Sequence, residues 1–513
     1  MEWTLAYTIW SGICLAIALL VIKNKVWSSS KNRPPGPPGW PIIGNFLDLG
    51  AAPHQSLASL SRKYGPVLWL RLGLTNTMVV SSAEAAMDMF KNHDLAFADR
   101  KTNEAMRVHN YYLGSMAFAR YGPYWRMLRR IATTELFTNN RINGTEDLRA
   151  KGIEKMTKWM WEETQEKGSV GVARFVALGS FNVIGNVTLT KDNIVDPQLE
   201  AGTEFFISLT RAIELSGLPN VSDFYPILKW LDPQRIRKNA ERAMAHPLNF
   251  ASGFVKERLL ARARGQINEK KDFLDVMLEF KGNQKDGEPA QMSEQNINIL
   301  LLELFLAATD TSASTIEWAM AELLRNPHIL KNVEAELDQV VGKNAKVTES
   351  DIWKLPYLQA VVKETLRLHP PVPLLVPRRC IEDTEYMGYS IPKDTQVLVN
   401  VWAIGRDPAS WEEPLSFKPE RFLNSNIDYK GQHYQLLPFG AGRRMCVGVM
   451  LGQRMLYLSI ASLVHTFEWA LEDGVTPETM DMREMFGTSL RKAEPLKAVL
   501  KLKAAQKDQD NVM

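Results

Sequence analysis

The chain has 513 residues, of which 45% are apolar and 23% are charged, and its formal net charge is +3. This length supports a large buried core and excludes a small binding module, and the nearly balanced charge indicates no nucleic-acid partner. The three cysteines, Cys14, Cys380 and Cys446, are far apart and form no Cys-x-x-Cys pair. They suggest neither a disulfide framework nor a zinc site, and they fit a reducing compartment.

The N-terminal segment is apolar, with no charged residue from Thr4 to Ile22. As a helix rising roughly 1.5 Å per residue, it just crosses a bilayer core of about 30 Å. Basic residues follow it, namely Lys23, Lys25, Lys31 and Arg33. We therefore predict a transmembrane signal anchor at 1–23, with the rest of the chain in the cytosol by the positive-inside rule. The alternative is a cleaved signal peptide, but the basic n-region and a small-residue cleavage site are missing.

A basic and proline-rich stretch follows at 24–45, and residues 34–41 read Pro-Pro-Gly-Pro-Pro-Gly-Trp-Pro. Because proline-rich segments are stiff and extended, this stretch predicts a hinge that sets how the next domain meets the membrane; an ordinary linker is the simpler interpretation. From 46 to 513 the sequence shows no internal repeat and no second domain boundary, so we predict a single domain there.

Most of this domain is predicted to be helical. Alternating β-formers predict a hairpin at Pro66–Ser81, and a second β-like stretch covers Arg378–Val401. Apolar residues at three-to-four spacing predict helices at Ser82–Lys91, Ile153–Thr164, Leu199–Leu215, Pro247–Arg264, Ser293–Arg325 and Lys354–Leu368. The predicted fold class is mainly α with a small β portion.

Three motifs combine charge with helical spacing. Residues 125–130 read Trp-Arg-Met-Leu-Arg-Arg, and the first and fifth lie one helical turn apart, although an ordinary basic helix face is the simpler interpretation. Residues 364–367 read Glu-Thr-Leu-Arg, so an acid and a base share a helix face, and their apolar neighbours indicate a buried pair rather than a surface salt bridge. The third motif is Pro-Glu-Arg-Phe at 419–422.

Residues 307–312 read Ala-Ala-Thr-Asp-Thr-Ser in the middle of the predicted helix Ser293–Arg325. Acids and hydroxyls are mildly unfavourable inside a helix because they compete for backbone hydrogen bonds, and a solvated polar turn is one interpretation. The flanks are apolar, however, and small Ala307 and Ala308 leave room for a flat cofactor. Asp310 and Thr311 are then candidates for proton delivery by general acid catalysis.

Residues 439–448 read Phe-Gly-Ala-Gly-Arg-Arg-Met-Cys-Val-Gly and precede an apolar, helix-like run from Val449 to Val464. The glycines allow a sharp turn and a close approach to a flat ligand. A helix beginning just after Cys446 favours a thiolate through its free N–H groups and positive end, and the arginines can hold a carboxylate. A lone cysteine is more often a small buried apolar residue, but a thiolate held in this way is a good axial ligand for haem iron.

The pattern Phe-x-x-Gly-x-Arg-x-Cys-x-Gly resembles the haem-binding loop of cytochromes P450, and the other motifs occur in that family's order. The resemblance covers essentially the full length, is of the plant microsomal type, and is greatest to the geraniol hydroxylase and iridoid oxidase group. It implies a cytochrome P450 fold behind an N-terminal transmembrane helix, with 46–513 as a haem-thiolate catalytic domain on the cytosolic side of the endoplasmic reticulum membrane. Two departures are Val447, where many members have proline, and Ala308, where many have glycine. The first bears on loop stiffness and the second on oxygen access.

The resemblance also assigns roles to residues. It implies haem b (iron protoporphyrin IX) as the cofactor, with Cys446 as the axial ligand of the iron, and Asp310 and Thr311 as catalytic residues. For cofactor binding it implies Trp125, Arg129, Ala307, Ala308, Phe439, Arg444, Cys446 and Gly448. It implies a buried structural charge network of Glu364, Arg367 and Arg421, and a substrate pocket that includes Phe305, Val372, Leu374, Leu375 and Phe486.

The activity that the resemblance implies is that of a monooxygenase, which inserts oxygen into an apolar C–H bond of a small hydrophobic plant metabolite. A monoterpenoid or iridoid is expected, and another terpenoid, an alkaloid or a xenobiotic stays open. Because the chain has no flavin or nicotinamide fingerprint, electrons are expected from NADPH through NADPH–cytochrome P450 reductase. The expected partners are this reductase, the substrate and membrane lipid. The other classes left open are a reductase-independent haem-thiolate isomerase or dehydratase, which the intact Asp310-Thr311 pair disfavours, and a non-enzymatic haem protein.

Overall fold

The computed structural model describes residues 7, 10–12, 14–15, 32–191, 193–197, 200–266 and 271–504. Most of the predicted anchor at 1–23 and the first part of the predicted hinge at 24–45 lie outside the described residues. Both therefore stay predictions.

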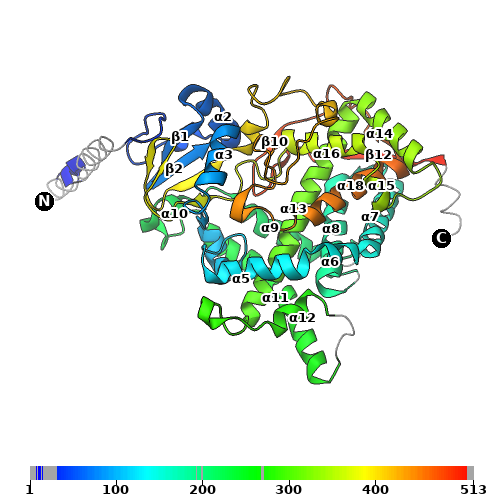
Figure 1. Ribbon diagram of the computed structural model, residues 1–513, viewed down its shortest axis with the longest axis horizontal. Coiled ribbons are helices and arrows are strands. Elements are labelled where there is room, and N and C mark those ends of the chain that lie inside the picture. Colours follow the sequence, from blue (N-terminus) through cyan, green and yellow to red (C-terminus); the bar gives the residue numbers. More distant parts are fainter. Residues whose placement is uncertain are drawn as a thin grey trace.

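Helices form most of the described chain. The longest of them, α13 (Glu294–Arg325), crosses the middle of the molecule and packs against α8, α11, α16 and α18 (Figure 1). The side chain of Ser293 caps its first turn by accepting a hydrogen bond from the Asn296 N–H. The other helices are α2 (Pro53–Tyr64), α3 (Ala83–Asn92), α4 (Tyr111–Gly114), α5 (Pro123–Ile131), α6 (Asn139–Asn143), α7 (Glu146–Lys167), α8 (Val172–Leu189), α9 (Glu200–Gly217), α10 (Val221–Phe224), α11 (Ile236–Ala263), α12 (Phe273–Glu279), α14 (Pro327–Val340), α15 (Glu349–Ile352), α16 (Pro356–Leu368), α17 (Val401–Ile404) and α18 (Val449–Thr466).

The strands form one larger sheet and three small ones. The five-stranded sheet has the order β1-β2-β8-β5-β3, in which only the β2–β8 pair is parallel. The others are a three-stranded sheet, β4-β12-β9, and the pairs β6-β7 and β10-β11. The strands are β1 (Val67–Leu72), β2 (Thr75–Val80), β3 (Asp99–Arg100), β4 (Val170–Gly171), β5 (Arg378–Arg379), β6 (Thr384–Tyr386), β7 (Tyr389–Ile391), β8 (Gln396–Val399), β9 (Phe467–Leu471), β10 (Glu484–Met485), β11 (Arg491–Lys492) and β12 (Lys497–Leu502). The predicted hairpin and the mainly α fold class are confirmed.

Two helices differ from the sequence-based prediction. The prediction of a helix that begins at Pro247 is wrong, because this proline is buried inside α11, which begins at Ile236. Tertiary packing here outweighs the cost of a missing backbone donor. Helix α8 was not predicted, because it is apolar on nearly all sides and has no amphipathic period. In the described part of the chain, α8 and α13 are long and apolar enough to cross a membrane, but most of each is buried in the protein core.

The described part of the proline-rich stretch lies along the edge strand β1. The Trp69 N–H donates to the Pro35 carbonyl at 2.8 Å, and the Asn45 N–H donates to the Arg71 carbonyl at 2.7 Å. The Asn45 side chain in turn accepts a hydrogen bond from the Arg71 N–H at 2.9 Å. These residues are therefore docked on the domain rather than extended away from it as a free linker.

Candidate functional site

The cysteine loop leads directly into a helix. The short 3₁₀ helix η7 (Gly442–Arg444) precedes Cys446, and α18 begins immediately after Gly448. The Cys446 N–H donates to the carbonyl oxygen of Phe439 at 2.9 Å and closes the loop. The thiol therefore lies near the N-terminus of an 18-residue helix, as the sequence predicts.

Two glycines of this loop are required by its backbone. Gly440 and Gly442 have φ angles of +69° and +68°, a region that strains residues with a side chain. At Gly442 a Cβ would also lie 2.4 Å from a carboxylate oxygen of Asp94. That carboxylate accepts hydrogen bonds from the Arg443 N–H at 2.9 Å and the Arg443 side chain at 3.0 Å. Asp94 thus binds the loop so closely at residue 442 that only glycine fits there.

The thiol of Cys446 has an unusual environment. Its side chain is accessible to water, yet it lies deep enough in the protein that burial raises the pKa of the thiol. A hydrogen bond from the Gly448 N–H and the charge of Arg129 oppose this effect and favour the thiolate. The guanidinium of Arg129 also donates to the Met445 carbonyl, next to the cysteine. An accessible, positively flanked cysteine is chemically different from a packed apolar one.

Phe439 and Gly448 flank the cysteine at the two ends of the loop. The half-buried ring of Phe439 lies 5.3 Å from the ring of Tyr429, measured between centroids. A Cβ on Gly448 would lie 3.9 Å from the Cys446 sulfur, which is an ordinary contact. A Cβ therefore fits beside the sulfur at this position, and the φ of −85° does not require glycine either.

Helix α13 has one accessible side in its otherwise buried middle. Ala307 is exposed, and Ala308 and Thr311 are half-buried, whereas most other residues of α13 are buried. Small accessible side chains on a core helix, together with an accessible thiol before α18, fit a flat apolar ligand bound between these two elements. Helices α13 and α18 pack against each other, which keeps the two elements close.

Thr311 and Asp310 already have partners in the structure. The Thr311 hydroxyl donates to the Ala307 carbonyl at 2.7 Å, one turn earlier in the helix. The buried carboxylate of Asp310 forms an ion pair with Arg491 of β11. In this arrangement the Thr311 oxygen can accept a hydrogen bond, and it must rotate before it can donate one to another group.

The predicted cofactor-binding residues Trp125, Arg129 and Arg444 lie together. The guanidinium carbon of Arg444 lies 4.1 Å from the ring centroid of Trp125, whose indole N–H donates to the Met116 carbonyl at 2.9 Å. The pKa of Arg444 is lowered to about 9, mainly by burial and secondly by the charge of Arg378. The guanidinium of Arg444 donates to three backbone carbonyls, those of Ala98, Met116 and Ala119.

Two further buried arginines were missed by the sequence analysis. Arg100 and Arg378 lie directly opposite each other across the antiparallel pair β3–β5. Like charges in such positions destabilise a sheet. Burial, together with the charges of Arg378 and Arg444, lowers the pKa of Arg100, and burial lowers that of Arg378 to about 10. Arg378 pairs with the carboxylate of Asp94 at 3.3 Å, and the remaining buried positive charge fits a ligand with carboxylate groups. In the sequence, Arg100 and Arg378 are marked only by apolar residues nearby, and arginines near apolar residues are common.

The acid that organises this region was also missed. Glu303 of α13 is buried, and its carboxylate accepts hydrogen bonds from the Ser115 hydroxyl, from the Met116 N–H at 2.6 Å and from the Ala117 N–H at 3.0 Å. The carbonyls of Met116 and Ala117 accept hydrogen bonds from the positively charged side chains of Arg444 and Arg100. Burial raises the pKa of Glu303, and these hydrogen bonds oppose the shift. One short segment thus joins α13 to the arginine cluster.

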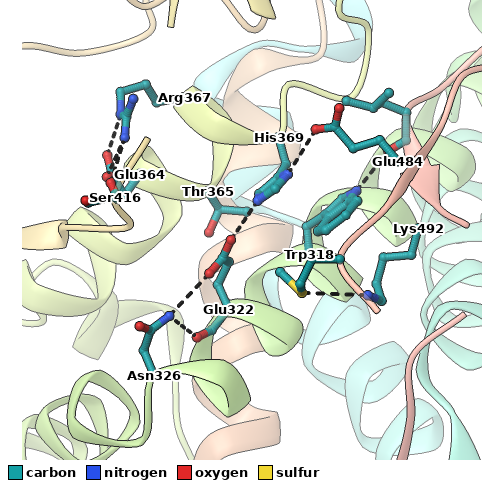
Figure 2. A network of polar contacts seen from close by, with 12 residues as sticks. Trp318, Glu322, Asn326, Glu364, Thr365, Arg367, His369, Ser416, Glu484 and Lys492 are labelled. Atoms are coloured by element: carbon teal, nitrogen blue, oxygen red, sulfur yellow. Dashed lines mark hydrogen bonds and ion pairs between the residues drawn. The ribbon is translucent and has the colours of Figure 1, made fainter. Parts of the chain in front are cut away.

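The structure brings Glu364, Arg367 and Arg421 together. The guanidinium of Arg367 makes two hydrogen bonds of 2.7 Å to the Glu364 carboxylate, and both side chains are fully buried (Figure 2). Arg421 reaches the same carboxylate at 3.1 Å. The remaining donors of Arg367 bond to carbonyls, including that of Ser416 at 3.1 Å. A fully partnered buried charge group of this kind fixes the local backbone rather than taking part in chemistry.

The predicted pocket residues do not all lie together. Phe305 is buried and stacks on Phe181 of α8, with ring centroids 4.3 Å apart. It is two residues from Ala307, so the two side chains point to nearly opposite sides of α13. Leu374 packs on the sheet with residues of β1, β2 and β8, and Phe486 stacks on His54 at 5.5 Å. Val372 and Leu375 are half-buried. Phe305 and Leu374 are thus buried among apolar side chains, and their role in the substrate pocket stays a prediction.

Comparison with known proteins agrees with this geometry. The family model described as "Cytochrome P450" matches residues 34–497. The chain belongs to the cytochrome P450 family. This P450 is 51% identical to cytochrome P450 76A2 of Solanum melongena over 98% of the chain and 100% of that protein. It is 50% identical to the iridoid oxidase of Catharanthus roseus over 95% of each chain.

Two further comparisons extend this result. The P450 is 41% identical to the geraniol 8-hydroxylase of Swertia mussotii, over 96% of this chain and 98% of that one. A solved zebrafish cytochrome P450 with progesterone has a TM-score of 0.73 and 26% identity, over 88% of this chain and 99% of that one. The fold is thus the P450 fold, and the protein is a plant P450 monooxygenase related to the iridoid oxidase and geraniol hydroxylase group. Its cofactor is haem iron, with electrons from NADPH through a reductase.

Proposed function

We propose that this P450 hydroxylates or further oxidises a small monoterpenoid or iridoid, with O2 and with electrons from NADPH–cytochrome P450 reductase. The observation that carries the proposal is 50% identity to an iridoid oxidase over 95% of both chains. Small apolar side chains such as Ala307, accessible in the middle of α13, support an apolar substrate.

In this proposal Cys446 would hold the haem iron through its sulfur. Its accessible sulfur, the Gly448 N–H and the nearby Arg129 support this role. The buried cluster of Arg100, Arg378 and Arg444, with Arg129 beside it, is the proposed partner of the two haem carboxylates. Two carboxylates there would offset the mutual repulsion that, with burial, lowers the pKa of Arg100. Trp125 and Phe439 pack beside the cofactor.

Haem held by the Cys446 thiolate would supply the oxygen activation, which a thiolate ligand favours by donating electron density. The residues of α13 supply the protons in this proposal. Asp310 holds an acid on the helix, and Thr311 offers its hydroxyl oxygen one residue later on the accessible side. Ala307 and Ala308 leave the apolar C–H bond of the substrate free to approach.

The proposed substrate class is tested in microsomes that contain this P450 and the reductase. Geraniol, other monoterpenoid alcohols and iridoids are incubated with NADPH, and the products are read by mass spectrometry. The proposal expects NADPH-dependent products that contain one added oxygen, or their further oxidised forms. If every monoterpenoid and iridoid stays unchanged while the reduced protein still shows the P450 carbon monoxide band, the proposed substrate class is wrong. Products formed without the reductase would instead point to an isomerase or dehydratase.

A second candidate substrate class is a xenobiotic aryl ether. A relative from Helianthus tuberosus named 7-ethoxycoumarin O-deethylase is 42% identical over 91% of this chain. This identity is similar to that of the geraniol 8-hydroxylases, so 7-ethoxycoumarin belongs in the same panel. Turnover of 7-ethoxycoumarin in the absence of terpenoid turnover would favour this candidate.

We also propose that the domain lies on the endoplasmic reticulum membrane through a second contact besides the predicted anchor. The loop after α9 exposes large apolar side chains, above all Ile227, which is 76% exposed, and Trp230, which is 79% exposed. It adjoins the N-terminal part of the described domain, because the Leu74 N–H donates to the Phe224 carbonyl at 3.1 Å. Figure 1 places α10 beside β1 and β2 at one end of the molecule. Such an edge fits an interfacial membrane contact.

Removal of residues 1–22 should therefore release this P450 from membranes only in part. Adding Ile227→Lys and Trp230→Lys should release most of the remainder, because two exposed apolar side chains become charged. The measurement is the bound fraction in liposome flotation. Trp353→Lys is the matched control, since Trp353 is 54% exposed and adjoins α15, on the other side of the molecule in Figure 1. Complete solubility of the truncated protein with its loop intact would contradict the second contact.

A further inference from the structure

A row of buried polar side chains runs along one side of α13. Asp310, Ser314, Trp318 and Glu322 follow at intervals of four residues, so they lie on one stripe of the helix. All four are buried. Buried polar groups cost free energy unless they are partnered. The partners of this stripe come from the β10–β11 hairpin, from His369 and, at Glu322, also from the Asn326 side chain.

The β11 side of the hairpin is held by hydrogen bonds to its backbone. The Leu490 carbonyl accepts from the Ser314 hydroxyl at 2.7 Å and from the Trp318 indole N–H at 3.0 Å. The Leu490 N–H donates to the Pro371 carbonyl at 2.8 Å. The next residue is Arg491, whose guanidinium pairs with Asp310. The main chain beside Arg491 is therefore fixed on the same helix that carries Asp310.

The C-terminal part of the stripe, Trp318 and Glu322, reaches strand β10 through His369 (Figure 2). Trp318 stacks on His369 with parallel rings whose centroids are 4.0 Å apart. The imidazole Nε2 of His369 lies 2.8 Å from a carboxylate oxygen of Glu322, and its Nδ1 lies 3.5 Å from one of Glu484, at the start of β10. On β11, the Lys492 ammonium lies 5.0 Å from the Trp318 ring centroid. The stripe thus contacts β11 directly and β10 through His369.

We propose that Arg491 is a positioning residue for the oxidation. Anchored by the stripe, it holds the Asp310 carboxylate in the place from which this acid serves proton delivery, so Arg491 acts through Asp310. This inference rests on the proposed function, because it needs the proton-delivery role of Asp310. A simple structural salt bridge would stabilise the fold without affecting how reduced oxygen is used, and this difference separates the two interpretations.

The experiment compares Arg491→Gln and Arg491→Lys in the full chain with the reductase. In Arg491→Gln we expect several-fold less product per NADPH and a matching gain of hydrogen peroxide, with the substrate-induced spectral shift and the reduced carbon monoxide band retained. Arg491→Lys keeps a cation and should restore most of the product. Arg483→Gln is the control, because Arg483 is exposed, precedes β10 and pairs only with Asp481 among the described residues. It should behave as wild type.

A second measurement needs no turnover, so it can be made even if the proposed substrate class is wrong. Carbodiimide labelling of Asp310, quantified by peptide mass spectrometry, should rise several-fold in Arg491→Gln and stay low in Arg491→Lys and Arg483→Gln. In an Asp310→Asn background, Arg491→Gln should add no further loss of product per NADPH, because both changes remove one interaction.

Three results would overturn the inference: unchanged labelling of Asp310 in Arg491→Gln, unchanged product per NADPH in that variant, or additive losses in the double variant. If Arg491→Gln fails to form the reduced carbon monoxide band, that variant is not correctly folded, and the test uses Arg491→Lys instead. Product per NADPH close to wild type then supports the positioning role, whereas a value as low as that of Asp310→Asn overturns it. A wild-type protein that oxidises no terpenoid contradicts the proposed function alone, since the labelling result still stands.

Discussion

Cys446→Ser should abolish the red shift that a thiolate ligand gives to reduced, carbon monoxide-bound haem, and product formation should fall below detection. A serine hydroxyl stays protonated where the thiol can ionise, so it offers no soft anionic ligand to the iron. The backbone of the loop should survive, because the hydrogen bond from the residue 446 N–H to the Phe439 carbonyl does not involve the side chain. The measurement is the reduced carbon monoxide difference spectrum of the purified variant.

The chain offers a matched control for this prediction in Cys380. This cysteine is buried, its thiol donates to the Glu382 carbonyl at 2.9 Å, and burial raises its pKa to about 11. Cys380→Ser makes the same chemical change away from the cysteine loop, so the red shift should persist. A folded Cys446→Ser protein that keeps the shift would show that another residue binds the iron, and the central assignment would be wrong.

The parts of the fold that follow from local pattern were predictable. Alternating β-formers predicted the β1–β2 hairpin, and apolar residues at three-to-four spacing predicted α13 almost to its ends. Helix α8 was not predicted, because burial on nearly all sides removes the polar face that reveals a helix in the sequence. Pro247 marked a false helix start, because packing, and not local propensity, decides whether a proline is tolerated.

The site was predictable where one continuous motif carries it. The glycines, arginines and cysteine of the cysteine loop lie within ten residues, so they are visible together in the sequence. Arg100 and Arg378 are 278 residues apart and meet only because β3 pairs with β5. Glu303 was hidden in the same way, since its partners at 115–117 lie on a distant segment. Phe305 was placed in the pocket by family position; its ring stacks on Phe181, and its pocket role stays a prediction.

Thr311→Ala should disturb the use of oxygen far more than the binding of substrate. The helix should survive, because alanine is the better helix former and the lost hydrogen bond, from the Thr311 hydroxyl to the Ala307 carbonyl at 2.7 Å, is local. The pocket stays apolar, so the substrate-induced spectral shift should be nearly normal. Without the hydroxyl, proton delivery beside Asp310 becomes disordered and reduced oxygen leaves as hydrogen peroxide. We expect NADPH consumption to continue while product per NADPH falls about tenfold, part of the roughly 10²- to 10⁴-fold that a positioned proton-transfer group supplies.

Thr315→Ala is the matched control for this second prediction. Thr315 is one turn further along α13 and makes the same type of bond, because its hydroxyl donates to the Thr311 carbonyl at 2.9 Å. It is buried, so its loss tests helix stability without removing an accessible hydroxyl. Product and hydrogen peroxide per NADPH should both match wild type in Thr315→Ala. If Thr311→Ala also keeps the full product yield per NADPH, Thr311 is only a polar residue of the helix, and Asp310, Ser312 or bound water carries the proton path.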